Sequence, residues 1–505
     1  MSDDATDEWV PISYPIPKHW EHGTFDECFG TLPTSGFKIR QKDYSQSGRY
    51  PVIDQGADFI GGYTDDKTKV FDLSEPVLVF GDHTKCFKFV TTAFAPGADG
   101  IHILTPRGHD AKYLYHLYHS LRLPDRGYSR HFSFLKRSKF PIAPLNEQRR
   151  IVEKIENLFA ELDKGEESLR VAKAQAVLYR QSLLKHAFEG HLTADWRATN
   201  PDKLEDPETL LARIQKERDA RYKQALDDWE AAVSTWRNEG EEGRKPVKPK
   251  RPREFDTSLE DIEITLCELP HGWFWQRLGL CTIGVEYGTS TRSDEIGKVP
   301  VIRMGNLQNG RIDWSDLVYT SSANDIAKYS LRRGDVLFNR TNSPELVGKT
   351  AFFVGDREAL FAGYLIRVNQ IEAIALGKYV MFFLNSIIAK SHGNMVKTDG
   401  VNQSNINGNK LQEYPFPYCS PKEQAEIVDR LEAKLSNLDA LVAEIDTQIK
   451  HSKALRQSIL KRAFSGKLVP QDPTDEPAAK LLERIMAERT AAHSPKAKRR
   501  KKANA

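Results

Sequence analysis

The sequence contains little cysteine, and its few cysteines are not spaced for a metal site. The 505 residues include five cysteines, an odd number, and no two of them form a C-x-x-C pair. We therefore expect neither a disulfide framework nor a zinc site. The cysteines are expected to pack as small apolar side chains: Cys28, Cys86, Cys267, Cys281 and Cys419.

Long hydrophobic runs are also lacking. No apolar stretch approaches the roughly 18 to 20 residues that a membrane-spanning helix needs. The first residues, MSDDATDEW, are acidic, whereas a secretory signal would begin with basic residues. These observations predict a cytoplasmic protein that does not interact with membranes.

Neither sign of charge is in large excess. Charged residues make up 28% of the chain, but the net charge is only +3. This balance argues against a uniformly basic protein that coats DNA, and any nucleic-acid surface must therefore be local.

Catalytic motifs are absent as well. The GKT at Gly348 resembles the end of a phosphate-binding loop, but Ser343 stands where that motif needs a glycine. We find no GxGxxG, no HExxH and no N-P-P-Y tetrapeptide of an adenine methyltransferase, and the fourteen histidines are dispersed. The chain is predicted to have no active site, no metal site and no cofactor of its own.

The prominent feature is an internal repeat. RQSLLKHAFEGHL at 180–192 returns as RQSILKRAFSGKL at 456–468, and an offset of 276 aligns 147–192 with 423–468 without a gap, with 16 identities in 46 pairs. Flanking segments repeat too, because 206–218 and 475–489 share an LL-x-RI-x-x-ER pattern and 16–28 resembles 269–281. The chain is therefore a tandem duplication.

Both aligned copies are predicted to be long helices that pack on each other. Apolar residues recur in steps of four and three, the spacing of a heptad seam, although polar residues interrupt the second copy. Ser420, Pro421 and Glu423 predict a capping box at one start, and Gly190 and Gly466 predict left-handed ends. The predicted seam residues are Ile151, Ile155, Leu158, Leu162, Leu183, Ile427, Leu431, Leu438, Ile445, Leu455 and Ile459.

Two globular units with short strands precede the two helices. Runs such as PVLVFGD and DVLFNRT predict strands, and 112–122 and 378–390 each predict a packed helix, so each unit is expected to be an α+β domain. The predicted order is a first globular domain at 1–146, a helix at 147–190, a helical region with a charged linker at 191–260, a second domain at 261–419, a helix at 420–466, and a C-terminal region with a disordered basic tail at 467–505.

One stretch in each unit is a candidate contact surface for nucleic acid. In the first, RGYSRHFSFLKRSK interleaves basic and aromatic residues; in the second, FNRTNSPELVGK and KTDGVNQSNINGNK concentrate amides and arginine, which pair well with bases and phosphates. The alternatives are a solvated strand edge whose aromatic residues belong to the core, and ordinary polar turns. The candidates are Arg126, Tyr128, Arg130, Lys136, Arg137, Lys139, Asn339, Arg340, Asn342, Lys349, Lys397, Asn402, Gln403 and Asn405.

The duplicated pattern resembles the specificity subunits of type I restriction-modification systems. The resemblance lies in Glu147, Gln148, Ile151, Val152 and 180–192 in the first copy, in 420–428 and 456–468 in the second, and in 468–485 and the two amide-rich stretches. It implies an α+β fold in which two target-recognition domains are separated by two antiparallel helices with pseudo-two-fold symmetry.

The resemblance also implies a function. Such a subunit reads a split target in double-stranded DNA without catalysis, one half-site per domain, and the helical coiled coil sets the gap between half-sites. Its expected partners are two methylation subunits and restriction subunits, which would carry S-adenosylmethionine and ATP with magnesium in a phage-defence complex. A coiled-coil protein scaffold and a self-contained modification enzyme are the competing hypotheses.

Overall fold

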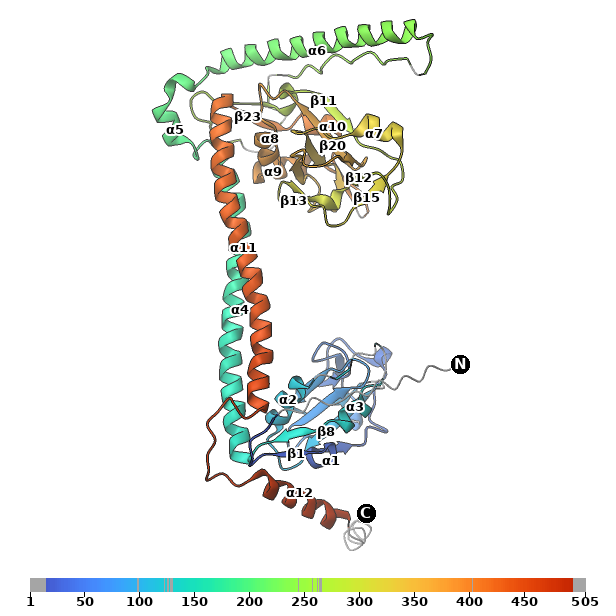
Figure 1. The fold of residues 1–505 in the computed structure, drawn as a ribbon, viewed down its shortest axis with the longest axis vertical. Coiled ribbons are helices and arrows are strands. Elements are labelled where there is room, and N and C mark those ends of the chain that lie inside the picture. The colour runs from blue at the N-terminus through green and yellow to red at the C-terminus, as the bar shows by residue number, and fades with distance from the viewer. Residues whose placement is uncertain are drawn as a thin grey trace. The chain divides into compact units, whose positions relative to one another are not determined.

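The computed structural model describes residues 15–493 except 98–99, 122, 125–126, 128–129, 244, 257, 261, 263–265 and 402. It divides into two compact units. Unit 1 combines residues up to 171 with those from 445 onward, and unit 2 comprises 172–444. Each unit therefore contains one globular domain, part of one long helix and part of the other (Figure 1). The basic tail expected at the C-terminus lies outside the described residues.

The first globular domain is built on an antiparallel sheet of order β2-β8-β5-β6 beside a small sheet of order β4-β3-β7. Strands β3 and β7 are parallel, and β1 pairs with β9. Leu78, Phe80 and Leu104 are buried on one face of the larger sheet, and Val79 and Ile103 are buried on the other, so both faces carry a core. The elements are β1 (Glu21–Gly23), α1 (Phe25–Cys28), β2 (Phe29–Leu32), η1 (Gln41–Asp43), β3 (Tyr50–Ile53), β4 (Gly62–Thr64), η2 (Lys67–Lys69), β5 (Val77–Gly81), β6 (Phe87–Val90), β7 (Ala95–Pro96), β8 (Ile101–Pro106), α2 (Ala111–Ser120), α3 (Phe132–Arg137) and β9 (Phe140–Ile142).

The second domain repeats this architecture. Its larger sheet has the order β11-β20-β16-β18, its smaller sheet the order β15-β12-β19, and β10 pairs with β23. The second domain also has the hairpin β13–β14 and the sheet β17-β22-β21. Its elements are β10 (Phe274–Arg277), η4 (Leu278–Cys281), β11 (Thr282–Tyr287), β12 (Val299–Ile302), η5 (Met304–Asn306), β13 (Leu307–Gln308), β14 (Arg311–Ile312), β15 (Val318–Thr320), α7 (Ala323–Tyr329), β16 (Val336–Asn339), β17 (Thr341–Asn342), β18 (Thr350–Phe352), β19 (Leu360–Phe361), β20 (Leu365–Gln370), α8 (Gly377–Leu384), α9 (Ile387–Val396), β21 (Thr398–Asp399), β22 (Ser404–Asn405), α10 (Gly408–Gln412) and β23 (Pro415–Tyr418).

The single helix predicted at 378–390 is wrong in one respect. The chain forms α8 and α9, separated at Asn385 and Ser386. The Ser386 hydroxyl accepts a hydrogen bond from the backbone N–H of Ala389 at 3.3 Å and caps α9. The apolar run continues through this break, so periodicity alone did not reveal it.

The two long helices are α4 (Leu145–Phe188) and α11 (Pro421–Phe464), with 44 residues each. At a rise of 1.5 Å per residue each is about 66 Å long. Both end before a glycine in the left-handed conformation, Gly190 at φ +79° and Gly466 at φ +67°, as predicted. A Cβ on Gly190 would lie 2.4 Å from Pro270, and one on Gly466 would lie 2.3 Å from Pro17, so each end requires glycine for two reasons.

The helices pair in an antiparallel manner within each unit (Figure 1). In unit 1 Arg456 of α11 forms an ion pair with Asp163 of α4, and in unit 2 Arg180 of α4 forms one with Asp439 of α11. The sum of the two residue numbers is the same in both pairs, so the register is constant. The predicted packing of the two repeat copies on each other is confirmed.

The repeated helix ends belong to the cores of the globular domains. Phe188 packs edge-on against Tyr379 of α8 with ring centroids 5.2 Å apart, and Phe464 packs in the same way against Tyr113 of α2 at 5.3 Å. Each helix therefore begins beside the domain that precedes it in sequence and ends in the core of the other domain. This placement explains why the chain repeats the LLK-x-AF signature.

Most predicted seam residues are buried or half-buried, but the prediction that Leu455 packs in the seam is wrong. Its side chain is 49% exposed. It lines an open groove in unit 1 together with Gly165, which has no side chain, and Ser452, whose side chain is small, so the space between the helices is not filled there. The buried seam residues are Ile151, Ile155, Leu183, Ile427, Leu431, Leu438, Ile445 and Ile459; Leu158 and Leu162 are half-buried.

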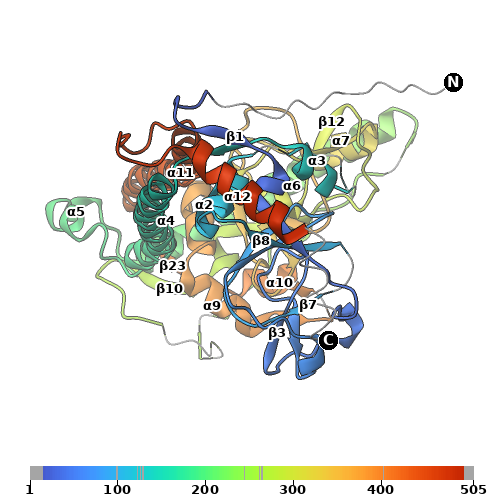
Figure 2. The same cartoon turned by 90° about the horizontal axis from the view of Figure 1, so that it is seen from below.

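A helical region follows each long helix. After α4 come α5 (Ala194–Thr199), η3 (Pro201–Lys203) and α6 (Pro207–Asn238), and after α11 comes α12 (Ala478–His493). Helix α12 lies against α1 and β1 of the first domain (Figure 2). Leu210 and Ile214 of α6 and Leu481 and Ile485 of α12 are buried, so the two repeated LL-x-RI segments pack in the same way.

The five cysteines are free thiols, and Cys28, Cys281 and Cys419 are buried. Burial raises the pKa of the Cys281 thiol to about 12, which fits a packing role. Among the described residues, no helix is long and apolar enough to cross a membrane.

Two buried histidines predict acid sensitivity in unit 1. Burial lowers the pKa of His109 and of His116 to about 4, from 6.5 in an unfolded chain. As pH falls, these histidines are therefore protonated in the unfolded chain before they are protonated in the folded one. Their contribution to the free energy of unfolding is complete above pH 6.5 and is lost between pH 6.5 and 4. We expect a loss of about 2 kcal/mol per histidine between pH 6.5 and 5.

Amide hydrogen exchange of α2 and β5 at pH 7, 6 and 5, corrected for the intrinsic rates, measures this loss. His109→Gln keeps an acceptor for the amide of Gln148, which lies 3.2 Å from Nδ1 of His109. Between pH 7 and pH 5, the free energy of unfolding of this variant is expected to fall by less than that of the wild type. Equal losses in both proteins would contradict the role of His109.

Candidate nucleic-acid interface

The two stretches singled out in the sequence occupy equivalent places in the two domains. In the first, the backbone N–H of His131 donates to the carbonyl of Asp82 at 2.9 Å; in the second, that of Ile406 donates to the carbonyl of Arg340 at 2.9 Å. Asp82 follows β5 and Arg340 follows β16, and these strands have matching partners in their sheets. The candidate loops therefore lie at the same sheet edge in both domains.

In the first domain the described basic candidates are exposed, and two of them rest on aromatic rings. Lys136 lies 4.9 Å above the ring of Phe132, and Arg137 lies 4.9 Å from that of Phe134. Arg130 and Lys139 are exposed as well. Long cationic side chains held at a surface suit contact with phosphates. Arg126 and Tyr128 lie outside the described residues.

The aromatic residues of this stretch are packed rather than free. Phe134 is 9% exposed, and Phe132 stacks on His102 with ring centroids 3.6 Å apart. The backbone N–H of Phe132 also donates to the carboxylate of Asp82 at 2.8 Å. The alternative that these rings belong to the core therefore describes them better than stacking on bases.

Sequence reasoning missed three residues beside this patch. Burial lowers the pKa of His102, and the positive charges of Lys136 and Lys38 lower it further, whereas Asp82 opposes the shift. Lys38 therefore extends the positive patch, His102 lies beside it with its neutral form favoured, and Asp82 borders it. They come from separate segments, and no spacing in the sequence links them.

In the second domain the structure brings together the two amide-rich stretches. Strand β17 pairs with β22, so that Thr341 faces Asn405 and Asn342 faces Ser404. The side-chain amide of Asn405 donates to the hydroxyl of Thr341 at 2.7 Å. Gln403 is exposed just before β22, and Asn402 lies outside the described residues.

Arg340 is the most constrained candidate of the second domain. Its guanidinium lies 4.8 Å from the ring of Tyr287, and its Nη1 donates to the carbonyl of Gly363 at 3.4 Å. The hydroxyl of Tyr287 is itself fixed, because it accepts a hydrogen bond from the N–H of Gly408 at 2.8 Å. A guanidinium held in this way has lost part of its rotamer freedom before it meets a base.

The remaining candidates differ in exposure. Lys349 donates to the side-chain carbonyl of Gln308 at 3.3 Å, and Lys397 forms an ion pair with Asp399 at 3.7 Å. Asn339 is fully buried at the end of β16, so its side chain does not reach the surface, and we withdraw it as a direct base contact. All four residues of β16 are buried, so the strand is covered on both faces, which the polar character of Asn339 did not indicate. Exposed residues missed by the sequence reasoning are Tyr364 and Val401.

No group of three or more acidic, histidine or cysteine side chains within the described part of the chain is arranged to hold a metal ion. The geometry instead gives two surfaces of basic and amide side chains, one in each domain, at equivalent sheet edges. Such a surface is suited to binding phosphates and reading base edges.

Comparisons with known proteins match this geometry. Residues 280–451 match the family described as the type I restriction modification DNA specificity domain. The chain is 26% identical over 375 residues to the type I restriction enzyme EcoKI specificity subunit of Escherichia coli (strain K12), covering 72% of this chain and 66% of that protein. It is 24% identical over 380 residues to the EcoBI specificity subunit of Escherichia coli, covering 73% and 68%.

One solved structure has the same fold. It was described under complex assembly and conformational transition of the type I restriction-modification system, and it matches with a TM-score of 0.58. Sequence identity is 17%, and the match covers 90% of this chain and all of that one.

The exposed cations of α3, together with Lys139 just after it, predict salt-dependent DNA affinity. Replacing Lys136, Arg137 and Lys139 together by glutamine removes up to three phosphate contacts, each of which releases counterions. We expect the slope of log affinity against log salt to become less negative by up to about 2.7. Fluorescence anisotropy with duplex DNA from 50 to 300 mM salt measures this slope. Arg332→Gln, an exposed arginine of the second domain, serves as control, and an unchanged slope in the triple variant would remove α3 from the interface.

Proposed function

We propose that the chain is the DNA-reading, non-catalytic specificity subunit of a type I restriction-modification complex, because it is similar to such subunits in sequence and in fold. Each globular domain reads one half of a bipartite target. The observation that carries the proposal is the duplication itself: two domains of the same strand order carry different side chains at the same sheet edge.

The difference between the two edges supports separate half-sites. Arg340 and Asp82 occupy equivalent positions but carry opposite charges. A constrained arginine pairs well with the two acceptors of guanine in the major groove. Asp82 is buried and engaged by Phe132, so the first domain relies on other groups, among them Lys136 and Lys38. The two half-sites are therefore expected to differ in sequence.

The paired helices serve as the ruler in this proposal. Each runs without interruption from one unit into the next, because α4 and α11 both cross the boundary between the two units. Duplicated readers related by a pseudo-two-fold axis suit a target whose halves lie about one DNA turn apart, roughly 34 Å.

The partners follow from the same proposal. Two methylation subunits would supply S-adenosylmethionine and flip the target adenine, and restriction subunits would supply ATP hydrolysis and cleavage. Exposed apolar residues on the paired helices, such as Leu178 and Leu441, are available for docking. The complex would act in the cytoplasm. The scaffold hypothesis differs from this proposal in predicting no steep salt dependence of DNA affinity.

Methylation mapping tests the proposal. The chain is co-expressed with the methylation subunits of its own system, and methylated adenines are located by sequencing. We expect a bipartite motif with a constant gap. Arg340→Gln is expected to relax one base of one half-site, by about 1–3 kcal/mol of discrimination, and to leave the other half-site unchanged. An unsplit motif would refute the assignment.

Shortening the helices tests the ruler. Residues 165–171 of α4 lie opposite 448–454 of α11 in the register set by the two ion pairs. Deleting both segments removes about 10.5 Å, the length of about three base pairs. Mapping should show a gap shorter by about three base pairs with both half-sites unaltered. The affinity for DNA is expected to fall, because removing three base pairs also rotates one half-site relative to the other by about a third of a DNA turn. A change in half-site sequence would contradict the ruler.

A further inference from the structure

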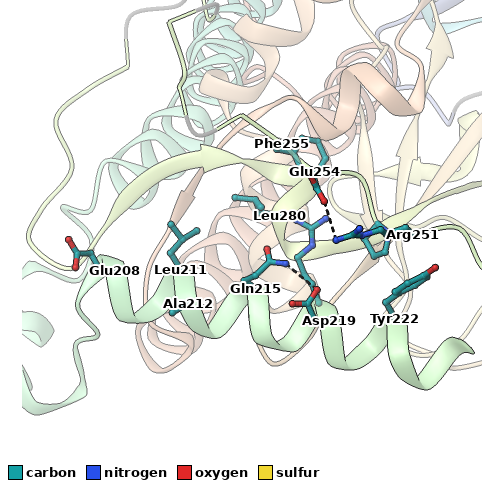
Figure 3. A pocket seen from close by; sticks show the side chains of 12 residues that line it. Glu208, Leu211, Ala212, Gln215, Asp219, Tyr222, Arg251, Glu254, Phe255 and Leu280 are labelled. Atoms are coloured by element: carbon teal, nitrogen blue, oxygen red, sulfur yellow. Dashed lines mark hydrogen bonds and ion pairs between the residues drawn. The ribbon is translucent and has the colours of Figure 1, made fainter. Parts of the chain in front are cut away.

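A cavity of about 540 Å³ lies in unit 2 between the first half of α6, η4 and the segment 251–255 that returns along the helix (Figure 3). Half of the lining residues are apolar or aromatic, with Leu211, Tyr222 and Phe255 among them, and the other half are charged or amide side chains. Cavities of this size with a few polar groups suit small organic ligands. None of these residues belongs to the candidate DNA surface.

Arg218 is the charged group in the wall of this cavity, and it is only 4% exposed. Its Nη2 donates to the backbone carbonyl of Arg253 at 2.5 Å, and its guanidinium lies 5.6 Å from the ring of Phe255. Among the described residues it forms no ion pair with a carboxylate, and its Nε has no hydrogen-bond partner. Asp219 and Glu254 interact with its charge electrostatically without a direct ion pair. Because a buried charge without a direct partner is costly, an anion in contact with the guanidinium would be stabilised.

The repeat in unit 1 shows which kind of partner Arg218 lacks. Arg489 stands at the matching position of the LL-x-RI-x-x-ER repeat and forms an ion pair with Asp26 at 3.2 Å. Aligning 16–28 with 269–281 places Gly279 where Asp26 stands. A Cβ on Gly279 would lie 2.0 Å from Phe255, so no side chain fits there. Unit 2 thus keeps the arginine but has a glycine and a cavity in place of the acid.

The other charges of the cavity limit what it can bind. Asp219 accepts a hydrogen bond from Gln215 at 3.1 Å, and Glu254 pairs with Arg251 at 3.2 Å (Figure 3). Glu208 also lines the cavity. Three carboxylates beside two arginines disfavour a polyphosphate but leave Arg218 available for one negative charge.

We propose that this cavity binds a singly charged carboxylate with an apolar body, whose oxygens take the place at Arg218 that Asp26 takes at Arg489. The planar guanidinium matches a carboxylate in geometry, and the aromatic wall receives the apolar body. The same chemistry is presented by a free organic acid and by the C-terminal residue of a peptide. The proposal is independent of DNA reading.

Calorimetric titration of the full chain at constant ionic strength tests the proposal. The probes are benzoate, N-acetylphenylalanine and N-acetylphenylalanine amide, which lacks the charge. We expect the wild type to bind a carboxylate at least tenfold more tightly than the amide. Binding of benzoate would identify a free acid as sufficient, whereas binding of N-acetylphenylalanine alone would identify a chain end.

Variants at matched positions complete the test. Arg218→Met is expected to reduce carboxylate binding at least tenfold, and Arg218→Lys, which keeps the charge, provides a second variant should the first fold poorly. Arg221→Met, an exposed site on the same helix, should bind as the wild type does. The proposal is overturned if neither carboxylate binds better than the amide, or if both Arg218 variants bind as tightly as the wild type.

Discussion

The structure depends on one buried carboxylate at the start of each long helix. Glu423 is fully buried and accepts hydrogen bonds from the indole of Trp273 at 2.8 Å and from the hydroxyl of Thr193 at 2.7 Å, and it pairs with Arg197. Glu147 accepts from Trp20 at 3.0 Å and from Gln471 at 2.7 Å. In each unit a carboxylate thus joins a globular domain, the start of one helix and the chain beyond the end of the other.

The position of these carboxylates at the helix start and their hydrogen bonds together offset the cost of burying their charge. A negative charge in the first turn of a helix interacts favourably with the helix dipole, and the surrounding donors replace lost hydration. The neighbouring glutamines repeat the arrangement, because Gln148 and Gln424 each donate to the carbonyl five residues before them and accept from a backbone N–H of the domain. The E-Q pair therefore fixes the helix starts, and the recognition edges are free to differ.

The two globular domains share their core contacts but differ in the side chains at their candidate DNA surfaces, which explains how one architecture can present two different surfaces. The tyrosines Tyr113 and Tyr379 donate to the carbonyls of Pro141 and Pro417 at 2.8 and 2.9 Å, so this buried contact is the same in both domains. At the sheet edges the correspondence is confined to the backbone, where Asp82 and Arg340 share hydrogen bonds but not charge. Substitutions there alter what the domain presents without altering what holds it in place.

The sequence by itself determined the duplication, the two long helices and their glycine ends, because repeats, periodicity and left-handed glycines are local properties. Only the tertiary structure decided what the Glu423 carboxylate binds. The Ser420 hydroxyl accepts from the N–H of Glu423 at 3.3 Å, as expected for a helix cap. The carboxylate, however, binds Trp273 and Arg197 instead of completing the predicted capping box. The tertiary structure likewise buried Asn339, exposed Leu455 and, among the described residues, gave Arg218 no direct ion pair with a carboxylate. Each outcome depends on which distant segment lies opposite, and spacing along the chain does not carry that information.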